Sequence, residues 1–199
     1  MSRSAIPLQR RGHRERPYWE IRATEEIYSN GYFRLRRDEC FLTRAPLVSA
    51  NLYVLEMPDI VSVVPVTPDG KLVLVEQYRH GVDRWLLECP GGALSADDPR
   101  PLDTARRELR EETGFEAEEF VSLGAHYPNP SGQTNRIHTF LAKGCVRVAE
   151  PDLERFEHLR VRLVDRQELM SLAQAGAAIQ TGTLASVLLA TALLDSAAQ

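Results

Sequence analysis

Apolar positions that alternate with polar ones, or gather in β-branched runs, predict a series of β-strands along the chain. The clearest are two runs, 60–66 and 72–78, which flank the turn sequence Thr67-Pro68-Asp69-Gly70. Because proline presets its φ and glycine accepts positive φ, we expect these runs to pair as a hairpin. Shorter strand patterns occur at 33–36, 85–88, 121–125, 137–142 and 159–164.

A helical pattern in the middle of the chain covers 102–113 and ends at Gly114, a residue suited to the left-handed conformation that closes helices. The pattern leaves the start of this helix open. Asp98 is a favourable N-cap, but Pro101 disfavours the helical conformation at Arg100, so we expect an irregular first turn.

Two further helices are predicted near the C-terminus. Asp165 and Glu168 have the spacing of a capping box, and Gly176 suits the end of the helix that they open. A largely apolar helix is expected at 183–194. Together with the strands, these segments predict an α+β domain with a mixed sheet, one central helix and a C-terminal helical pair.

Composition narrows the class of protein. The chain has 199 residues, enough to bury a core without disulfides. Its cysteines, Cys40, Cys89 and Cys145, are far apart and form no C-x-x-C, which favours free thiols in a reducing, cytoplasmic compartment. The longest apolar stretch, 185–194, is shorter than the ~20 residues of a membrane span, so we expect no membrane partner.

Charge is divided unevenly along the chain. The net charge is −4, yet residues 1–16 contribute +4 and the rest of the chain −8. An acidic body is a poor surface for nucleic acid, so no nucleic-acid partner is expected. We interpret residues 1–17 as a basic, disordered tail, with a nucleic-acid arm as the alternative.

Acidic side chains concentrate in the second half of the central helix. Glu108 and Glu112 are one turn apart, beside the apolar stripe of Leu102, Ala105 and Leu109. Like charges at this spacing repel, more strongly beside an apolar wall, so a cationic group is expected there. It could be an arginine of the helix or a Mg²⁺ ion shared with a phosphorylated substrate; a solvated acidic face is the alternative.

The residues around these glutamates resemble the box of the Nudix hydrolases, G-x5-E-x7-R-E-U-x-E-E-x-G-U, in which U is a bulky apolar residue. Here the box runs from Gly92 through Asp98 to the segment Arg107-Glu108-Leu109-Arg110-Glu111-Glu112-Thr113-Gly114-Phe115. Asp98 replaces the first glutamate of the pattern, and one extra residue precedes Arg107. The half that carries the paired glutamates is intact.

Segments outside the box are similar to the ADP-ribose pyrophosphatase branch of that family. They are 75–79, 85–92 and Tyr127-Pro128-Asn129-Pro130, and the similarity covers about residues 18–195. The resemblance implies a Nudix fold: an α/β/α sandwich with a mixed sheet, a central loop–helix motif and N-terminal antiparallel strands. It divides the chain into 18–58, strands suited to dimerisation, and 59–199, the hydrolase domain.

The resemblance also implies roles for residues of the box. Glu108 and Glu112 would bind Mg²⁺, or alternatively Mn²⁺, together with the backbone carbonyl of Gly91. Glu111 would share a metal or hold a water molecule. Arg107 would pair with the carboxylates of the box and order its loop.

Outside the box, the resemblance implies that Arg79 and Glu88 line the substrate groove, where they contact phosphate and adenine or ribose. The catalytic base of this branch is a glutamate on the loop before a late strand. Glu154 and Glu157 are the candidates, and spacing favours Glu157 as base or metal ligand. Trp19 is a candidate for stacking on adenine, with core packing an equal alternative.

The implied activity is Mg²⁺-dependent hydrolysis of the diphosphate bond of a nucleoside diphosphate sugar, with ADP-ribose yielding AMP and ribose 5-phosphate as the leading expectation. GDP-mannose or another nucleotide sugar is a neighbouring alternative. A non-catalytic ADP-ribose sensor would be expected to lose the carboxylates, which are retained here. An RNA-end hydrolase would need a basic face. A homodimer is expected.

Overall fold

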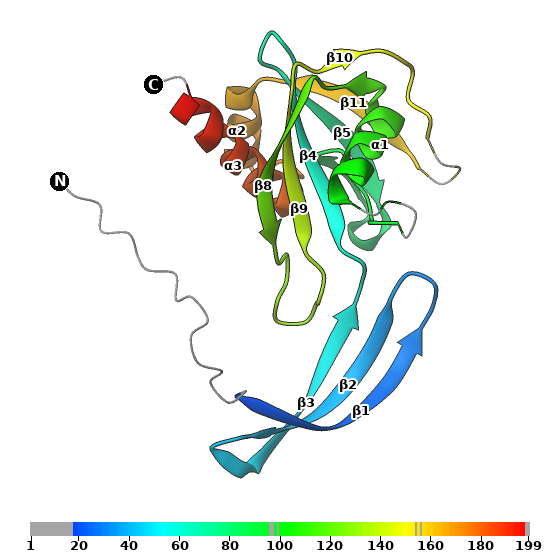
Figure 1. Ribbon diagram of the computed structural model, residues 1–199, viewed down its shortest axis with the longest axis vertical. Coiled ribbons are helices and arrows are strands. Elements are labelled where there is room, and N and C mark those ends of the chain that lie inside the picture. The colour runs from blue at the N-terminus through cyan, green and yellow to red at the C-terminus, as the bar shows by residue number, and fades with distance from the viewer. Residues whose placement is uncertain (1–17, 96–97, 99, 154, 156, 198–199) are drawn as a thin grey trace, which may run out of the picture. The chain divides into compact units, whose positions relative to one another are not determined.

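The computed structural model describes residues 18–95, 98, 100–153, 155 and 157–197, and the chain divides into two compact units, 1–56 and 57–199. Figure 1 shows the elements in chain order. The predicted tail, residues 1–17, and the candidate Glu154 lie outside the described residues. Each unit is considered separately below.

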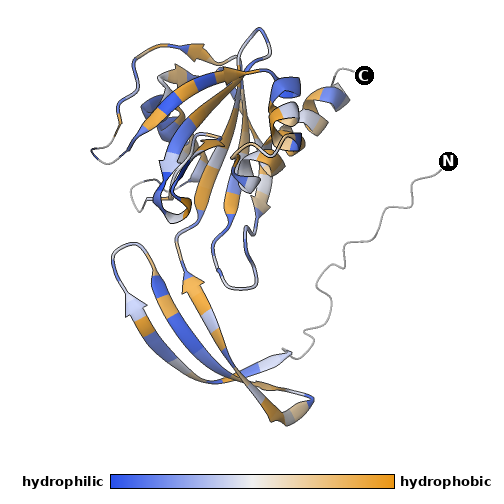
Figure 2. Cartoon of the chain, turned by 180° about the vertical axis from the view of Figure 1, so that it is seen from behind, coloured by the Kyte–Doolittle hydropathy of each residue, from blue (hydrophilic) through white to orange (hydrophobic). Residues whose placement is uncertain are grey.

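The N-terminal unit is an antiparallel sheet of three strands, β1 (Trp19–Ser29), β2 (Arg34–Leu42) and β3 (Ala45–Glu56). Hydrophilic and hydrophobic residues intermingle along these strands (Figure 2), and most side chains of β1 are exposed. Asp38, on β2, is by contrast 2% exposed. Thr24 donates a hydrogen bond to its carboxylate at 2.8 Å and Arg36 pairs with it at 2.7 Å. The buried charge is therefore compensated within the sheet.

The second unit is built on a mixed sheet, as predicted. Its strands lie in the order β11-β5-β4-β9-β8, with β6 paired to β5; β4 and β9 are parallel and the other pairs antiparallel. The strands are β4 (Ile60–Val66), β5 (Leu72–Arg79), β6 (Arg84–Glu88), β8 (Glu119–His126), β9 (Ile137–Lys143) and β11 (Leu159–Val164). A short turn of 3₁₀ helix (His80–Val82) precedes β6, and β7 (Phe115–Glu116) pairs with β10 (Val146–Arg147).

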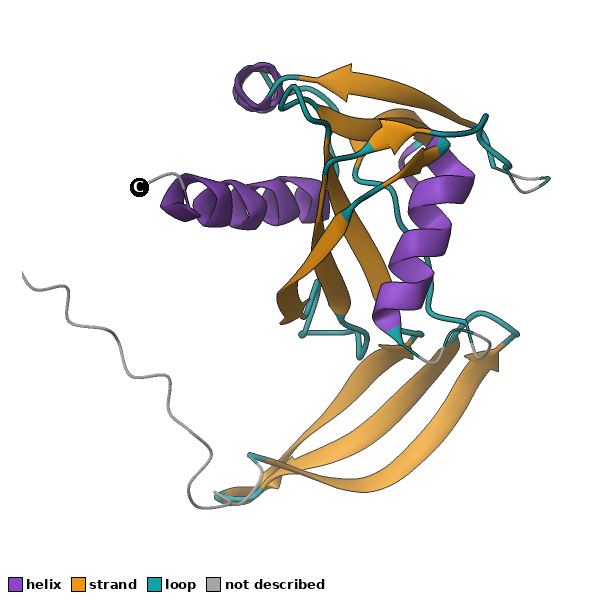
Figure 3. Ribbon diagram, turned by 45° about the horizontal axis from the view of Figure 1, so that its top comes forward, coloured by secondary structure: helices purple, strands orange, loops and turns teal. Residues whose placement is uncertain are grey.

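Helices cover both faces of this sheet. They are α1 (Pro101–Thr113), α2 (Arg166–Gln174) and α3 (Thr181–Ala197). In Figure 3, α1 lies on one face and α3 on the other. Successive residues of β4 serve the two layers: Val63 belongs to the core under α1, with Leu109, whereas Val64 belongs to the core under α3, with Val187. The predicted α/β/α sandwich is confirmed.

The predicted hairpin between β4 and β5 forms only at its turn, where Val66 pairs with Leu72. Further along, β4 bonds to the glycine-rich segment that follows β6, and the N–H of Val61 donates to the carbonyl of Gly92 at 2.8 Å. This segment takes backbone partners that a full hairpin would have supplied. The turn chemistry was correct, but the extended pairing was not.

Helix boundaries follow the proline and glycine signals more closely than the acidic caps. Helix α1 begins at Pro101, because the proline holds Arg100 in an extended conformation (φ −126°, ψ 137°). Asp98 is therefore not the N-cap. Gly114, with φ 73°, ends the helix as predicted. Asp165 precedes α2, but its side chain makes no capping hydrogen bond, so the predicted capping box is wrong.

The cysteines Cys40, Cys89 and Cys145 are buried and free, in agreement with the sequence. Within the described residues, no helix combines the length and apolar character that crossing a bilayer requires.

Candidate active site

Residues predicted to act together lie around one cleft of about 370 Å³ in the second unit. It is bounded by the ends of β4, β5 and β6, by α1 and by the segment before β11. Five of the predicted site residues line it: Arg79, Glu88, Gly91, Glu112 and Glu157. They come from separate parts of the sequence, and the sheet brings them together.

Two glutamates of α1 are buried here: Glu112 lines the cleft, and the carboxylate of Glu108 lies against Gly92, which also lines it. Glu112 is 3% exposed and Glu108 8% exposed. The N–H of Gly91 donates to Oε2 of Glu112 at 2.8 Å. Burial raises the pKa of Glu112 to about 8 against the effect of this bond, and the negative charges of Glu108 and Glu157 act in the same direction as burial. Burial and these charges therefore favour the neutral form of Glu112 near neutral pH, and a cation in the cleft would stabilise the charged form.

Two glycines allow the loop before α1 to pass close to this charge. A Cβ at position 92 would collide with the carboxylate of Glu108, and one at position 91 would collide with the backbone carbonyl of Val61. Glycine is therefore required at Gly91, where the neighbour is backbone, while a side chain at position 92 would displace the carboxylate of Glu108. The two glycines let the loop pass between Val61 of β4 and Glu108 of α1.

Arg107 connects three carboxylates of the box. Its guanidinium lies 3.0 Å from Oδ2 of Asp98, 3.0 Å from Oε1 of Glu108 and 2.7 Å from Oε2 of Glu111. Asp98, which departs from the family pattern, thus makes an ion pair despite its shorter side chain. The contacts tie the loop at Asp98 to the helix.

Arg79 and Glu88 form a bidentate pair between β5 and β6. Nε and Nη2 of Arg79 donate to the two carboxylate oxygens of Glu88, each at 2.8 Å. Glu88 is 2% exposed, and its carboxylate raises the pKa of Arg79 above the usual value. A fixed cation therefore stands at one end of the cleft, held by the residue expected to contact adenine or ribose.

The remaining predicted residues differ in position. Glu157 lies just before β11, is partly buried and lines the cleft. Trp19 lies on β1 in the N-terminal unit, edge-on to Tyr18 with ring centroids 5.9 Å apart. Its role at the site stays a prediction.

The donor set fits a divalent metal that is shared with substrate. Within the described residues, no three Asp, Glu, His or Cys side chains form a complete metal cage. Glu108 and Glu112 nevertheless offer hard oxygen donors in a buried, negatively charged corner. Mg²⁺ is commonly held by one or two carboxylates and completes its shell with water and phosphate oxygens.

A polar cluster that the sequence did not reveal supports the edge of the cleft. Asp59 accepts hydrogen bonds from the backbone and guanidinium of Arg136, both at 2.8 Å, and pairs with Nε2 of His138 at 2.9 Å. Its backbone carbonyl accepts the N–H of Leu94 at 2.9 Å. The cluster joins the start of β4 to the start of β9 and to the loop after Gly92. These residues are too far apart in the chain for any spacing pattern to show.

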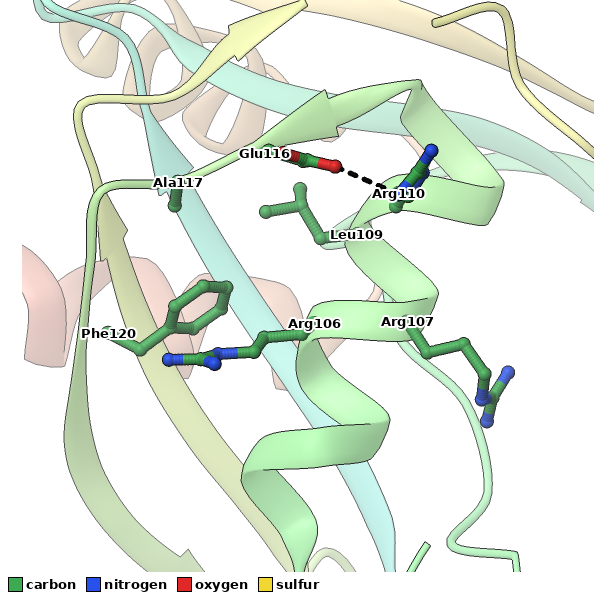
Figure 4. A pocket seen from close by; sticks show the side chains of 7 residues that line it. All are labelled: Arg106, Arg107, Leu109, Arg110, Glu116, Ala117 and Phe120. Carbon is green, nitrogen blue, oxygen red and sulfur yellow. Dashed lines mark ion pairs between the residues drawn. The ribbon is translucent and has the colours of Figure 1, made fainter. Parts of the chain in front are cut away.

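A separate cavity of about 420 Å³ lies on the other flank of α1 (Figure 4). Arg106 lies over the ring of Phe120, 5.5 Å from its centroid, and Arg110 pairs with Glu116 at 3.0 Å. Arg107 points away from this group in Figure 4. The paired glutamates do not line it, so it is not the candidate active site.

Comparison with known proteins agrees with this geometry. The sequence model of the NUDIX domain matches residues 57–185, more than half of the chain. The chain therefore belongs to the Nudix hydrolase family. The resemblance inferred from the residues of the box is confirmed.

Two relatives and one structure define its neighbourhood. The chain is 35% identical to the methanol dehydrogenase activator of Bacillus methanolicus, over 61% of this chain and 64% of that protein. It is 29% identical to the ADP-ribose pyrophosphatase of Bacillus subtilis, over 77% of this chain and 82% of that protein. The match thus spans less than two thirds of the activator. A crystal structure of an ADP compounds hydrolase superposes with a TM-score of 0.77 at 19% identity, over 89% of this chain and 95% of that chain, which confirms the fold.

Proposed function

We propose that this protein hydrolyses the diphosphate bond of nucleoside diphosphate sugars with Mg²⁺, and that ADP-ribose, cleaved to AMP and ribose 5-phosphate, is its leading substrate. The observation that carries the proposal is the buried pair Glu108 and Glu112, of which Glu112 accepts a hydrogen bond from Gly91 and lines the cleft that also holds the cation of Arg79. Likeness to an ADP-ribose pyrophosphatase supports the substrate class.

The residues of the cleft divide the work of hydrolysis. Glu108, Glu112 and the carbonyl of Gly91 would hold the metal. A bound divalent metal neutralises charge on the diphosphate and lowers the pKa of a water molecule. Arg79, fixed by Glu88, positions a phosphate oxygen. Glu157 would take the proton of the attacking water, and Arg107 keeps the loop and Glu111 in place.

A substrate panel tests the proposal. The purified protein is incubated with ADP-ribose, GDP-mannose, other nucleotide sugars and capped RNA, with Mg²⁺, with Mn²⁺ and with a chelator, and the products are identified. We expect AMP and ribose 5-phosphate from ADP-ribose, and no product with the chelator. Preference for GDP-mannose would change the leading substrate but keep the class, nucleoside diphosphate sugars. Turnover of capped RNA alone would contradict the proposal, and binding of ADP-ribose without turnover would favour the sensor.

The N-terminal unit is proposed to form a homodimer interface. Its sheet leaves large apolar side chains in contact with water. Ile21, Ile27, Tyr28, Leu52 and Tyr53 are 37–56% exposed. Exposed apolar surface of this kind is typical of protein–protein contacts.

A further inference from the structure

The segment that follows β6 is held in place by backbone bonds on several sides. The carbonyls of Pro90 and Gly92 accept N–H groups of β4 at 2.9 Å and 2.8 Å. Between them, the N–H of Gly91 donates to Oε2 of Glu112 on α1 at 2.8 Å. The N–H of Cys89 is the next anchor of this segment, and its partner lies on a third element.

The partner of Cys89 is a side chain in the first turn of α3. Its N–H donates to Oγ1 of Thr183 at 2.8 Å, across 94 residues of sequence. Thr183 is 0% exposed and Cys89 is 8% exposed, so the bond lies in the interior of the unit. Helix α3 covers the face of the sheet opposite α1 (Figure 3). The bond therefore connects the segment that carries Gly91 to the layer of the sandwich that holds none of the paired glutamates.

The hydroxyl of Thr183 takes a place that a backbone carbonyl would fill in a longer strand pair. Leu87 bonds as in a parallel ladder: its N–H donates to the carbonyl of Ala178 at 2.9 Å, and its carbonyl accepts the N–H of Gln180 at 3.2 Å. In such a ladder the next N–H, that of Cys89, would donate to the carbonyl of Gln180. That carbonyl instead accepts the N–H of Thr183 at 3.0 Å, because α3 begins there. The side chain of Thr183 supplies the missing acceptor.

We propose that Thr183 is a positioning residue of the metal site. Its hydroxyl fixes the N–H of Cys89, and thereby the carbonyl of Gly91 two residues on, where that carbonyl and Glu112 can ligate one cation. The inference rests on the part of the proposed function that assigns a metal to these ligands. Without the hydroxyl, the buried N–H of Cys89 loses its acceptor, which is unfavourable unless the segment shifts to find another. A shift of the segment moves the carbonyl of Gly91 away from Glu112.

Removal and restoration of the hydroxyl test the proposal. Thr183→Val keeps the shape of the side chain and removes the acceptor. We expect its dissociation constant for Mn²⁺, measured by electron paramagnetic resonance without substrate, to rise about tenfold or more, as is common when a group that orients metal ligands is lost. Thr183→Ser keeps the acceptor and should bind Mn²⁺ as wild type does. In turnover, Thr183→Val should need about tenfold more Mg²⁺ for half its maximal rate and approach the wild-type kcat at saturating Mg²⁺, because the ligands themselves are unchanged.

A neighbouring hydroxyl on α3 provides the matched control. Ser186 is 2% exposed, and its hydroxyl bonds that of Ser62 at 3.1 Å rather than the segment after β6. Ser186→Ala should lower the melting temperature and leave the affinity for Mn²⁺ unchanged. Hydrogen exchange of the Cys89 amide should be faster in Thr183→Val than in Thr183→Ser or Ser186→Ala. Thermal melting shows that each variant is folded, and Thr183→Ala, which removes the same oxygen, takes the place of Thr183→Val if that variant does not fold.

The outcomes separate the two proposals. If no nucleoside diphosphate sugar is hydrolysed, but affinity for Mn²⁺ falls in Thr183→Val and returns in Thr183→Ser, the proposed activity is wrong and the positioning role stands. If ADP-ribose is hydrolysed and Thr183→Val binds Mn²⁺ as tightly as wild type, the positioning role is wrong and the activity stands. Equal losses of affinity in Thr183→Val and Ser186→Ala would also contradict the positioning role, since the loss of any buried hydroxyl from α3 would then have the same effect.

Discussion

At the scale of single residues, the site is governed by carboxylates that have been removed from water. Glu112 is almost fully buried, and its charge is opposed both by desolvation and by the neighbouring charges of Glu108 and Glu157. A buried anion of this kind is unfavourable for stability unless a cation compensates it. This burial supports the proposed role of Glu112 in metal binding.

Replacement of Glu112 by glutamine separates these effects. We expect Glu112→Gln to lower kcat by at least about 100-fold, since even residues that only orient a metal ligand cost 10–100-fold when changed. The metal-free protein should melt at the same temperature or higher, because a neutral amide has a smaller desolvation penalty. The matched control is Glu116→Gln. Glu116 lies on β7, is half-exposed and pairs with Arg110 of α1, so this variant should behave like wild type. Full activity of Glu112→Gln would contradict the proposal that Glu112 binds the metal.

The proposed base makes a separate prediction. Glu157→Gln should reduce kcat by at least about 100-fold with little change in KM, as expected when a general base is lost. The control is Glu150→Gln, whose carboxylate is 86% exposed and pairs with Arg147. Single-turnover rates measured with saturating Mg²⁺ test the prediction. An unchanged rate would transfer the role to Glu154 or to the glutamates of α1.

At the scale of elements, the candidate site is shaped by the way the loop after β6 meets α1. The loop bonds to β4 on one side through Gly92 and contacts Glu108 on the other. Arg107 closes the arrangement by pairing with Asp98, Glu108 and Glu111. A planar guanidinium can bridge several carboxylates, which a single ammonium group cannot do as well.

The close approach at Gly92 is open to a direct test. Gly92→Ala should displace the carboxylate of Glu108, lower the free energy of unfolding by about 1–3 kcal/mol, and reduce kcat. Gly132→Ala is the control, because no atom lies within 4 Å of a Cβ built at that glycine. Urea unfolding and turnover are measured for both variants. If Gly92→Ala matches Gly132→Ala in both measurements, the close contact between Gly92 and Glu108 affects neither stability nor turnover.

At the scale of the whole molecule, the two units have different kinds of surface. The unit 57–199 has a core on each face of its sheet, whereas the three-stranded unit leaves most of β1 exposed. A small sheet that buries little apolar surface gains stability from a partner. This is the physical argument for a dimer through the N-terminal strands.

The dimer is tested with a charge on the exposed sheet. Tyr53, on β3, is 56% exposed, and Tyr53→Glu should convert the dimer to a monomer in sedimentation velocity at micromolar concentration. Glu20→Lys, an exposed substitution on β1, is the control and should leave the dimer intact. A wild-type protein that sediments as a monomer would contradict the proposed interface.

Local chemistry in the sequence predicted several features of the fold correctly. The strands of the second sheet, the α+β class with a mixed sheet, the glycine end of α1 and the acidic pair beside an apolar stripe follow from periodicity and residue type. The α/β/α sandwich and the N-terminal antiparallel strands were implied by the family resemblance. The capping box at Asp165 and the full hairpin after β4 did not form. For the hairpin, a segment distant in sequence, the glycine-rich loop after β6, takes the backbone partners of β4.

The sequence by itself determined the composition of the site, because the spacing of Glu108 and Glu112 on a helix and the glycines before it are local properties. Only the tertiary structure decided what surrounds them: the bidentate pair of Arg79 with Glu88, the support from Asp59, and the bond from Cys89 to Thr183. These arrangements join residues from strands and helices distant in the chain. Burial and charge environment depend on that packing, which no local pattern encodes.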